Sequence, residues 1–135
     1  MPDEETFSIK DLEQEFGLTL RTLRFYEERG LVRPGRRGEM RVYSTADKKR
    51  LELITRFKTL GFPLSEVKQI VDLYEAPLGR RENMKGLETR LREQREVLSE
   101  QCRALEKMLR LMDETLAEVN GELSDEDTRD LHGGN

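Results

Sequence analysis

Apolar residues recur at intervals of three or four along the first half of the chain, and glycines separate the apolar stretches. The first stretch follows Ser8, which can form a capping box with Asp11, and Gly17 ends it. The second stretch begins after Thr19 and closes at Gly30. Two short helices with a glycine-containing turn between them predict a helix-turn-helix.

The segment from residue 33 to residue 43 breaks this helical pattern. Pro34 and two glycines exclude a helix there, so the arginine-rich segment predicts a two-stranded basic hairpin, or wing. Two further helices follow the wing. The third is capped by Ser44 and ends at Gly61, and Pro63 opens the fourth.

A period of seven governs the second half of the chain. From about Glu82 to Val119 there is no proline, and apolar residues form two sevenfold rows offset by four. This pattern predicts a coiled-coil helix whose simplest partner is a second copy of the chain. The residues expected in that dimer interface are Leu91, Leu98, Cys102, Leu105, Leu109, Met112, Leu116 and Val119.

These elements predict a mainly α-helical protein in four parts. Residues 1–76 form a winged helix-turn-helix head with a small two-stranded wing, and residues 77–81 form a linker. Residues 82–120 form the dimerisation helix, and residues 121–135 form a disordered acidic tail.

Composition narrows the class of protein. Of the 135 residues, 35% are hydrophobic and 39% are charged, which leaves little apolar mass to line a large enclosed pocket. No run of about 18 apolar residues predicts a membrane span, and the acidic N-terminus does not resemble a secretory signal. A single cysteine fits a reducing compartment. We therefore expect a cytoplasmic protein, associated with the nucleoid if it binds DNA.

The sequence contains few residues that could serve in catalysis or metal binding. The chain has one cysteine, Cys102, and one histidine, His132, so a Cys/His metal cage within one chain is not expected. No Ser/His/Asp or Cys/His set and no phosphate-binding glycine loop are present. We expect no enzyme activity and no cofactor.

The net charge of −4 hides two opposite blocks. Residues 21–58 hold twelve Lys or Arg against five Asp or Glu, a net charge of +7, whereas residues 113–130 carry −7. Because binding depends on the local field, the basic block indicates a nucleic-acid partner. The alternative is that both blocks are solvated faces.

The basic block supplies candidate DNA contacts. Arginine can bond guanine through two parallel hydrogen bonds in the major groove, and threonine and tyrosine hydroxyls commonly bond phosphate. The candidates are Thr19, Arg21, Thr22, Arg24 and Tyr26 in the second helix, Arg36, Arg37 and Arg41 in the wing, and Arg56 and Lys58 in the third helix. The alternative is that Arg21 and Arg24 only pair with Glu27 and Glu28.

Five segments carry a resemblance to a known family. They are Phe7–Leu12, Gly17–Glu27, Gly30–Pro34, Arg41–Ser44 and Leu60–Val67. Together they resemble MerR-family transcriptional regulators over about Phe7–Tyr74. The resemblance implies a homodimer through an antiparallel coiled coil and a near-palindromic promoter operator that the protein distorts for RNA polymerase. It also places Tyr43 among the DNA contacts of the wing.

The resemblance does not extend to the cysteines that sensing members of the family carry around the dimer helix. Metal-sensing and redox-sensing members carry cysteines near the start of the dimer helix and after it, and this chain lacks them, so soft-metal and iron–sulfur sensing are not expected. Cys102 in the heptad rows is either a small buried filler or a thiol switch.

A narrower resemblance concerns the regulated pathway. Arg33–Gly38 and Asp72–Pro77 resemble regulators of branched-chain amino acid and fatty acid degradation, which implies an acyl-CoA-type effector. Arg80, Arg81 and Lys85 are candidate anion contacts, with a solvated face as the alternative.

Two other functions stay open at this point. A non-specific architectural protein would bend DNA with a flat sequence preference. A coiled-coil adaptor whose head binds protein would show no salt-dependent DNA binding.

Overall fold

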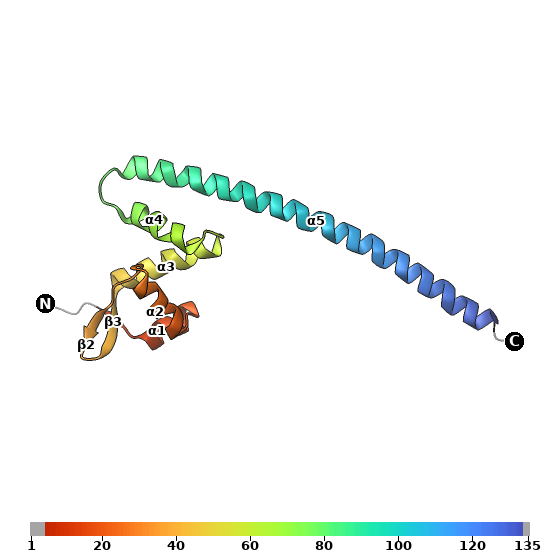
Figure 1. Cartoon of the computed structure of the whole chain (residues 1–135), viewed down its shortest axis with the longest axis horizontal. Coiled ribbons are helices and arrows are strands. Elements are labelled where there is room, and N and C mark those ends of the chain that lie inside the picture. The colour runs from red at the N-terminus through yellow and green to blue at the C-terminus, as the bar shows by residue number, and fades with distance from the viewer. Residues whose placement is uncertain (1–4, 134–135) are drawn as a thin grey trace. The chain divides into compact units, whose positions relative to one another are not determined.

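The computed structural model describes residues 5–133 of the chain, with the side chains of residues 5–129 (Figure 1). The chain divides into two compact units, Met1–Gln94, which we term the head, and Arg95–Asn135. The elements in chain order are β1 (Thr6–Phe7), α1 (Ile9–Phe16), α2 (Leu20–Glu28), β2 (Gly35–Arg37), β3 (Met40–Ser44), α3 (Thr45–Thr59), α4 (Leu64–Glu75) and α5 (Arg80–Gly133).

Local hydrogen bonds fix the helix starts of the head. The Ser8 hydroxyl accepts from the Asp11 N–H at 3.2 Å, and the Asp11 carboxylate accepts from the Ser8 N–H at 2.9 Å. Ser44 and Asp47 repeat this capping box at the start of α3. Gly17 ends α1 with a φ of 66°, in the left-handed region that favours glycine. The predicted helix-turn-helix is confirmed.

The wing has three strands where two were predicted. The order is β1-β3-β2, antiparallel throughout, with Arg36 opposite Arg41 and Phe7 opposite Tyr43. β1 is only two residues long, too short for an alternating pattern to reveal it, and it pairs with a strand more than thirty residues away.

The core of the head extends beyond the predicted boundary at residue 76. Leu87 in the second turn of α5 is buried with the core, and Met84 and Leu91 pack against it. Gln94 Nε2 donates to the Leu60 carbonyl at 2.8 Å. The remaining fully buried side chains include Leu12, Leu23, Tyr26, Leu31, Val32, Tyr43, Leu51, Ile54, Val67, Ile70 and Val71.

Leu91 has a neighbour within its own chain that the heptad pattern did not predict. It continues the heptad row and packs against the core of its own head, but it is only partly buried, so its place in the dimer interface stays a prediction. The heptad pattern identifies one apolar face of a helix and does not say which neighbour covers each level of that face.

Residues 95–133 form the rest of α5, which runs further than predicted. The expected disordered tail is helical through Gly133, and residues 134–135 lie outside the described part. Between residues 113 and 132 there is no proline and only one glycine, Gly121, whose cost of about 1 kcal/mol in a helix interior does not force an end. The acidic composition was a weaker signal than the absence of a helix stop.

None of the helices among the described residues is apolar over a stretch long enough to cross a bilayer.

Candidate nucleic-acid interface

Helix α2 presents two arginines on the face opposite its buried side chains. Leu23 and Tyr26 anchor α2 in the core, whereas Arg21 and Arg24, three residues apart, are exposed side by side. Thr19 caps the helix by accepting from the Thr22 N–H at 3.1 Å, and the two hydroxyls lie 3.0 Å apart. The start of α2 therefore offers a hydroxyl pair beside two guanidinium groups.

An open hollow of about 840 Å³ lies along this face of α2. It brings together six of the predicted contacts, including Lys58 from the last turn of α3. The predicted residues that line it are Thr19, Arg21, Thr22, Arg24, Tyr26 and Lys58. Arg56 is exposed on α3 but does not line this hollow.

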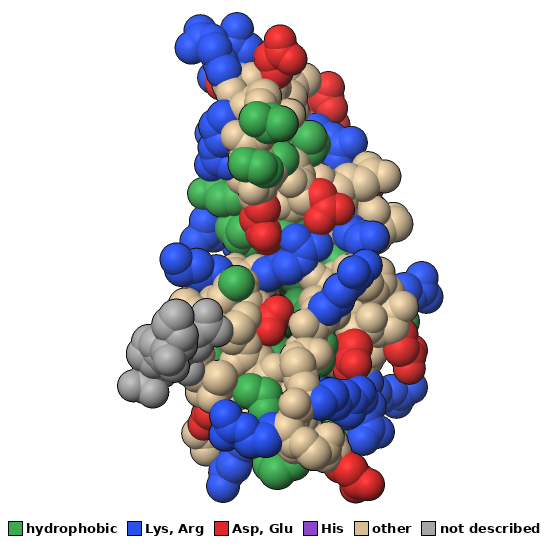
Figure 2. Space-filling view, turned by 90° about the vertical axis from the view of Figure 1, so that its left-hand side faces the viewer, with side chains coloured by type: hydrophobic (Ala, Val, Ile, Leu, Met, Phe, Trp, Pro, Cys, Tyr) green, Lys and Arg blue, Asp and Glu red, His purple; other side chains and the backbone are tan. Residues whose placement is uncertain are grey.

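An acid at the end of α2 holds the wing. Glu27 Oε1 lies 3.3 Å from Arg36 Nη2, and Glu27 Oε2 lies 2.6 Å from Arg41 Nε. Arg37, between them in sequence, stays exposed. Figure 2 shows Lys and Arg side chains over the whole of one face, including its lower part. The wing is thus basic and is held against α2.

The pairing of Glu27 decides between two sequence interpretations. Glu27 forms ion pairs with Arg36 and Arg41 of the wing. No ion pair of Arg21 or Arg24 occurs among residues 5–129. The alternative in which both arginines are neutralised on their own helix is therefore wrong. Their charge is available to an anionic partner.

The two tyrosines assigned to DNA are core residues. Tyr26 is 2% exposed and Tyr43 is fully buried, so neither presents its ring to a partner. Burial raises the pKa of Tyr43 above its ordinary value of 10.0, and Glu27 adds to the rise. The prediction from the sequence rested on the hydroxyl group of each tyrosine. Burial of the large apolar ring stabilises the fold more than a hydroxyl contact with phosphate would.

Sequence reasoning missed Phe25 and Arg29. Phe25 lines the hollow and is 39% exposed, and the Arg29 guanidinium lies 4.8 Å from its ring centroid. The available signal was an aromatic four residues before an arginine on the exposed face of a helix, a spacing that places the two side chains together.

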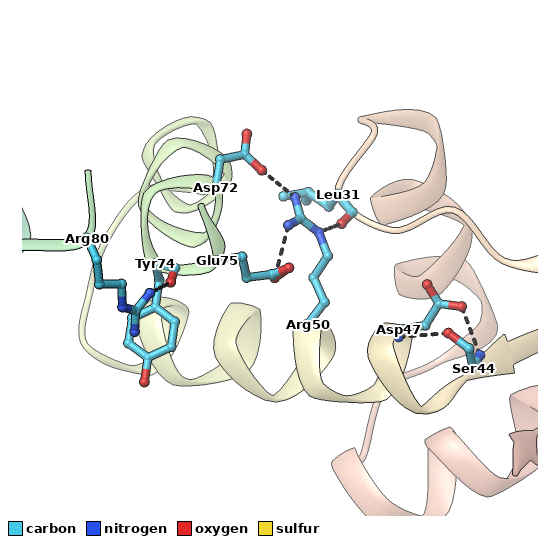
Figure 3. A network of polar contacts seen from close by, with 8 residues as sticks. All are labelled: Leu31, Ser44, Asp47, Arg50, Asp72, Tyr74, Glu75 and Arg80. Atoms are coloured by element: carbon cyan, nitrogen blue, oxygen red, sulfur yellow. Dashed lines mark hydrogen bonds and ion pairs between the residues drawn. The ribbon is translucent and has the colours of Figure 1, made fainter. Parts of the chain in front are cut away.

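Arg50 links three elements of the head (Figure 3). Its Nη2 lies 2.8 Å from Asp72 and its Nη1 lies 3.1 Å from Glu75, both on α4, while its Nε donates to the Leu31 carbonyl after α2. Next to this cluster, Arg80 at the start of α5 donates to the Tyr74 carbonyl and lies over the Tyr74 ring. These contacts position α2 relative to α4.

Among the described residues, no three His, Cys, Asp or Glu side chains are grouped as ligands for a metal ion. Cys102 is exposed on α5, with its Sγ 3.6 Å from Glu106 Oε1.

A capped recognition helix with exposed arginines, next to a basic wing, is the arrangement of a winged helix-turn-helix DNA-binding domain. Two family models match the chain: "MerR HTH family regulatory protein" over residues 7–73 and "MerR, DNA binding" over residues 48–120. The chain belongs to the MerR family of helix-turn-helix regulators.

Relatives of known name are consistent with this assignment. The transcriptional activator mta of Bacillus subtilis is 31% identical over 85% of this chain and 42% of its own length. The regulator CueR of Salmonella typhimurium is 38% identical over 52% of each. The chain spans about half the length of the curated relatives it matches.

Solved structures share the fold. A MerR-family regulator from Bacillus cereus superposes with a TM-score of 0.68 at 28% identity, covering 82% of this chain and 79% of its own. HiNmlR, described as a MerR family regulator lacking the sensor domain and bound to promoter DNA, superposes at 0.65 with 22% identity, over 84% of this chain and 85% of its own, which supports the fold alone.

Proposed function

We propose that the chain is a sequence-specific transcriptional regulator that binds a near-palindromic promoter operator as a homodimer, at the nucleoid in the cytoplasm. The observation that carries this proposal is the pair Arg21 and Arg24, exposed on α2 and unpaired with acids among residues 5–129. Bidentate bonds from such arginines to guanine would read base pairs. The wing, fixed by Glu27, would add phosphate contacts through Arg37.

The dimer proposal rests on the exposed apolar side chains of residues 95–129. Every predicted interface residue from Leu98 onward is exposed, with exposed fractions between 40% and 63% for the large apolar ones. An apolar row of this length does not persist in water without a partner. Val97, Met108, Leu111 and Leu123 are further exposed apolar residues that the two heptad rows did not include.

A dimer would double the arginine pairs and match the two-fold symmetry of an operator. We include in the proposal that the bound protein distorts its operator and acts with RNA polymerase there, as the family membership suggests. Distortion would make affinity depend on base pairs that the protein does not touch.

A finer proposal concerns an acyl-CoA-type effector. Its support is the narrower resemblance of Asp72–Pro77; of the candidate anion contacts, Arg80 is engaged by Tyr74 whereas Arg81 and Lys85 are exposed. Titration of an acyl-CoA, and of free CoA as the control, into the protein–operator complex tests it. A shift in operator affinity with acyl-CoA only would support the proposal, and no shift would reject it.

The main test is selection from fragmented genomic DNA at physiological salt, with sequencing of the retained fragments. One or a few palindromic motifs within promoters are expected. The Arg21→Ala/Arg24→Ala double variant is the matched control and should lose the motif while it retains its fold. Diffuse recovery with both proteins would favour an architectural DNA-bending protein, and no salt-dependent recovery would favour a protein-binding adaptor.

A further inference from the structure

A second hollow opens on the head next to the recognition helix. Its volume of about 630 Å³ lies within the range of small-molecule sites. Five of its lining residues are apolar, three are cationic, one is a serine and none is acidic. They are Phe25, Leu31, Phe62, Pro63, Leu64, Arg29, Lys58, Lys68 and Ser65.

The apolar part of this hollow is preformed. Leu31 and Phe62 belong to the core and are 1% and 7% exposed. The Phe62 ring packs edge-on against Phe57 with centroids 6.2 Å apart, and the Phe62 N–H donates to the Phe57 carbonyl at 3.2 Å. Because these two side chains are almost fully covered, the apolar surface that a ligand can reach comes from Phe25, which is 39% exposed, and from Pro63 and Leu64. Apolar surface fixed in this way favours a ligand with an apolar portion.

The cationic part carries no internal counter-charge. No ion pair of Arg29, Lys58 or Lys68 occurs among residues 5–129. Lys68 also lines a neighbouring hollow together with Gly30 and Asp72, and its Nζ lies 3.7 Å from where a Cβ on Gly30 would stand. Three cations without an acid in one hollow favour an anionic group.

We propose that this hollow binds a small amphipathic anion, with one carboxylate or phosphate at the cations and an apolar chain or ring against Phe25, Pro63 and Leu64. A DNA backbone phosphate would satisfy the cations but would leave the preformed apolar part unmatched, which is why a small ligand is favoured. Binding can be measured without DNA, so failure of this inference leaves the proposed function untouched.

Occupancy would affect the recognition surface. Phe25 and Lys58 line both hollows, so an anion in the second one adds negative charge next to the surface assigned to DNA. Ligand and DNA should therefore oppose each other, each weakening the other by the same factor.

The probe for the first experiment is octyl phosphate below its micelle concentration, titrated into the full chain by calorimetry. Inorganic phosphate and octanol are the two half-ligand controls. Octyl phosphate should bind at least about tenfold more tightly than either control, since both halves of the hollow contribute. Equal affinity of inorganic phosphate, or no binding of octyl phosphate, would overturn the inference.

Variants locate the site. Ser65→Glu puts an acid at the hollow in the first turn of α4, where an acid favours helix formation, so the fold should hold while octyl phosphate affinity falls about tenfold or more. Lys68→Gln should weaken binding severalfold, and Lys10→Gln on α1 is the matched control with no expected change.

Amide chemical shifts separate the remaining outcomes. Shifts confined to residues 25–31 and 58–68 support the site. Shifts along residues 97–123 would show that the probe coats the exposed apolar face of α5, and would overturn it. Loss of DNA affinity in Lys68→Gln without any octyl phosphate binding would reassign the hollow to the DNA backbone.

Discussion

Arg41 Nε lies 2.6 Å from Glu27 Oε2, so a carboxylate on the recognition helix is bonded to the central strand of the wing. Both side chains are largely buried, with 19% and 25% exposure. The same carboxylate also reaches Arg36. One acid thus sets the spacing between two surfaces that we assign to adjacent parts of the DNA.

Glu27→Gln should separate affinity from specificity. The substitution removes the one negative charge that neutralises Arg36 and Arg41, so affinity for non-operator DNA should rise severalfold at low salt, and the salt dependence should steepen by about one unit of slope. The operator preference should fall about tenfold because the wing loses its register. Fluorescence anisotropy from 50 to 200 mM salt measures both, and an unchanged preference would contradict a role for the wing.

Substitution of Arg21 and substitution of Arg37 should affect DNA binding in different ways. Arg21→Ala should cost about 1–3 kcal/mol at particular base pairs of the operator, since a bidentate contact is lost. Arg37→Ala should weaken binding to all DNA alike and lower the salt slope by about one. A panel of single-base operator variants tests the pair. If both substitutions weaken binding uniformly, the base-reading role of Arg21 is wrong.

Local signals predicted most of the helical head, and non-local contacts account for the errors. Ser8 with Asp11, and Ser44 with Asp47, cap helices through bonds three residues apart, which a sequence displays directly. The pairing of Glu27 with Arg41 spans fourteen residues. No local pattern shows such a contact, and Arg24, three residues away on the same helix, was a competing partner for Glu27.

The same distinction explains the environments of Tyr43 and Leu91. Tyr43 lies opposite Phe7 of β1 and belongs to the core, and Leu91 packs, partly buried, against the same core. In both cases the residue type allowed two environments, and only the tertiary arrangement selects one. The tail differed for another reason, since an acidic composition is compatible with either disorder or an extended helix.

Leu105→Lys should dissociate the dimer. Leu105 is 58% exposed on α5, and a buried lysine in its place would be unpaired in the interface. The variant should sediment as a monomer at micromolar concentration and bind the operator at least tenfold more weakly. Lys107→Gln, on the opposite face of the helix by heptad position, is the control. A dimer of unchanged strength would exclude the coiled-coil assignment.

Arg50→Met should destabilise the head more than removal of either acid. Arg50 is 17% exposed and loses three partners, including the Leu31 carbonyl, so a cost of about 2 kcal/mol is expected. Asp72 and Glu75 are 55% and 42% exposed, so Asp72→Asn or Glu75→Gln should each cost less than about 1 kcal/mol. Thermal unfolding at one fixed protomer concentration compares the three variants. Equal losses of stability would contradict the central role of Arg50 in linking these elements.

Tyr43→Phe tests whether the buried hydroxyl contacts DNA or only occupies the core. The Tyr43 hydroxyl has no hydrogen-bond partner among the described residues, so its removal should leave stability unchanged or slightly raised. Because burial raises the pKa of Tyr43 in the folded protein, the folded state holds this proton above pH 10, where the unfolded chain releases it.

Stability should therefore fall as the pH rises through 10, and this part of the loss should be absent in Tyr43→Phe. The free energy of unfolding is measured between pH 8 and 11 for both proteins. The difference between them isolates the contribution of Tyr43 from that of the other tyrosines. Operator affinity at pH 7.5 should stay within about twofold of the parent. A larger loss with stability unchanged would restore the DNA contact that the family resemblance implied.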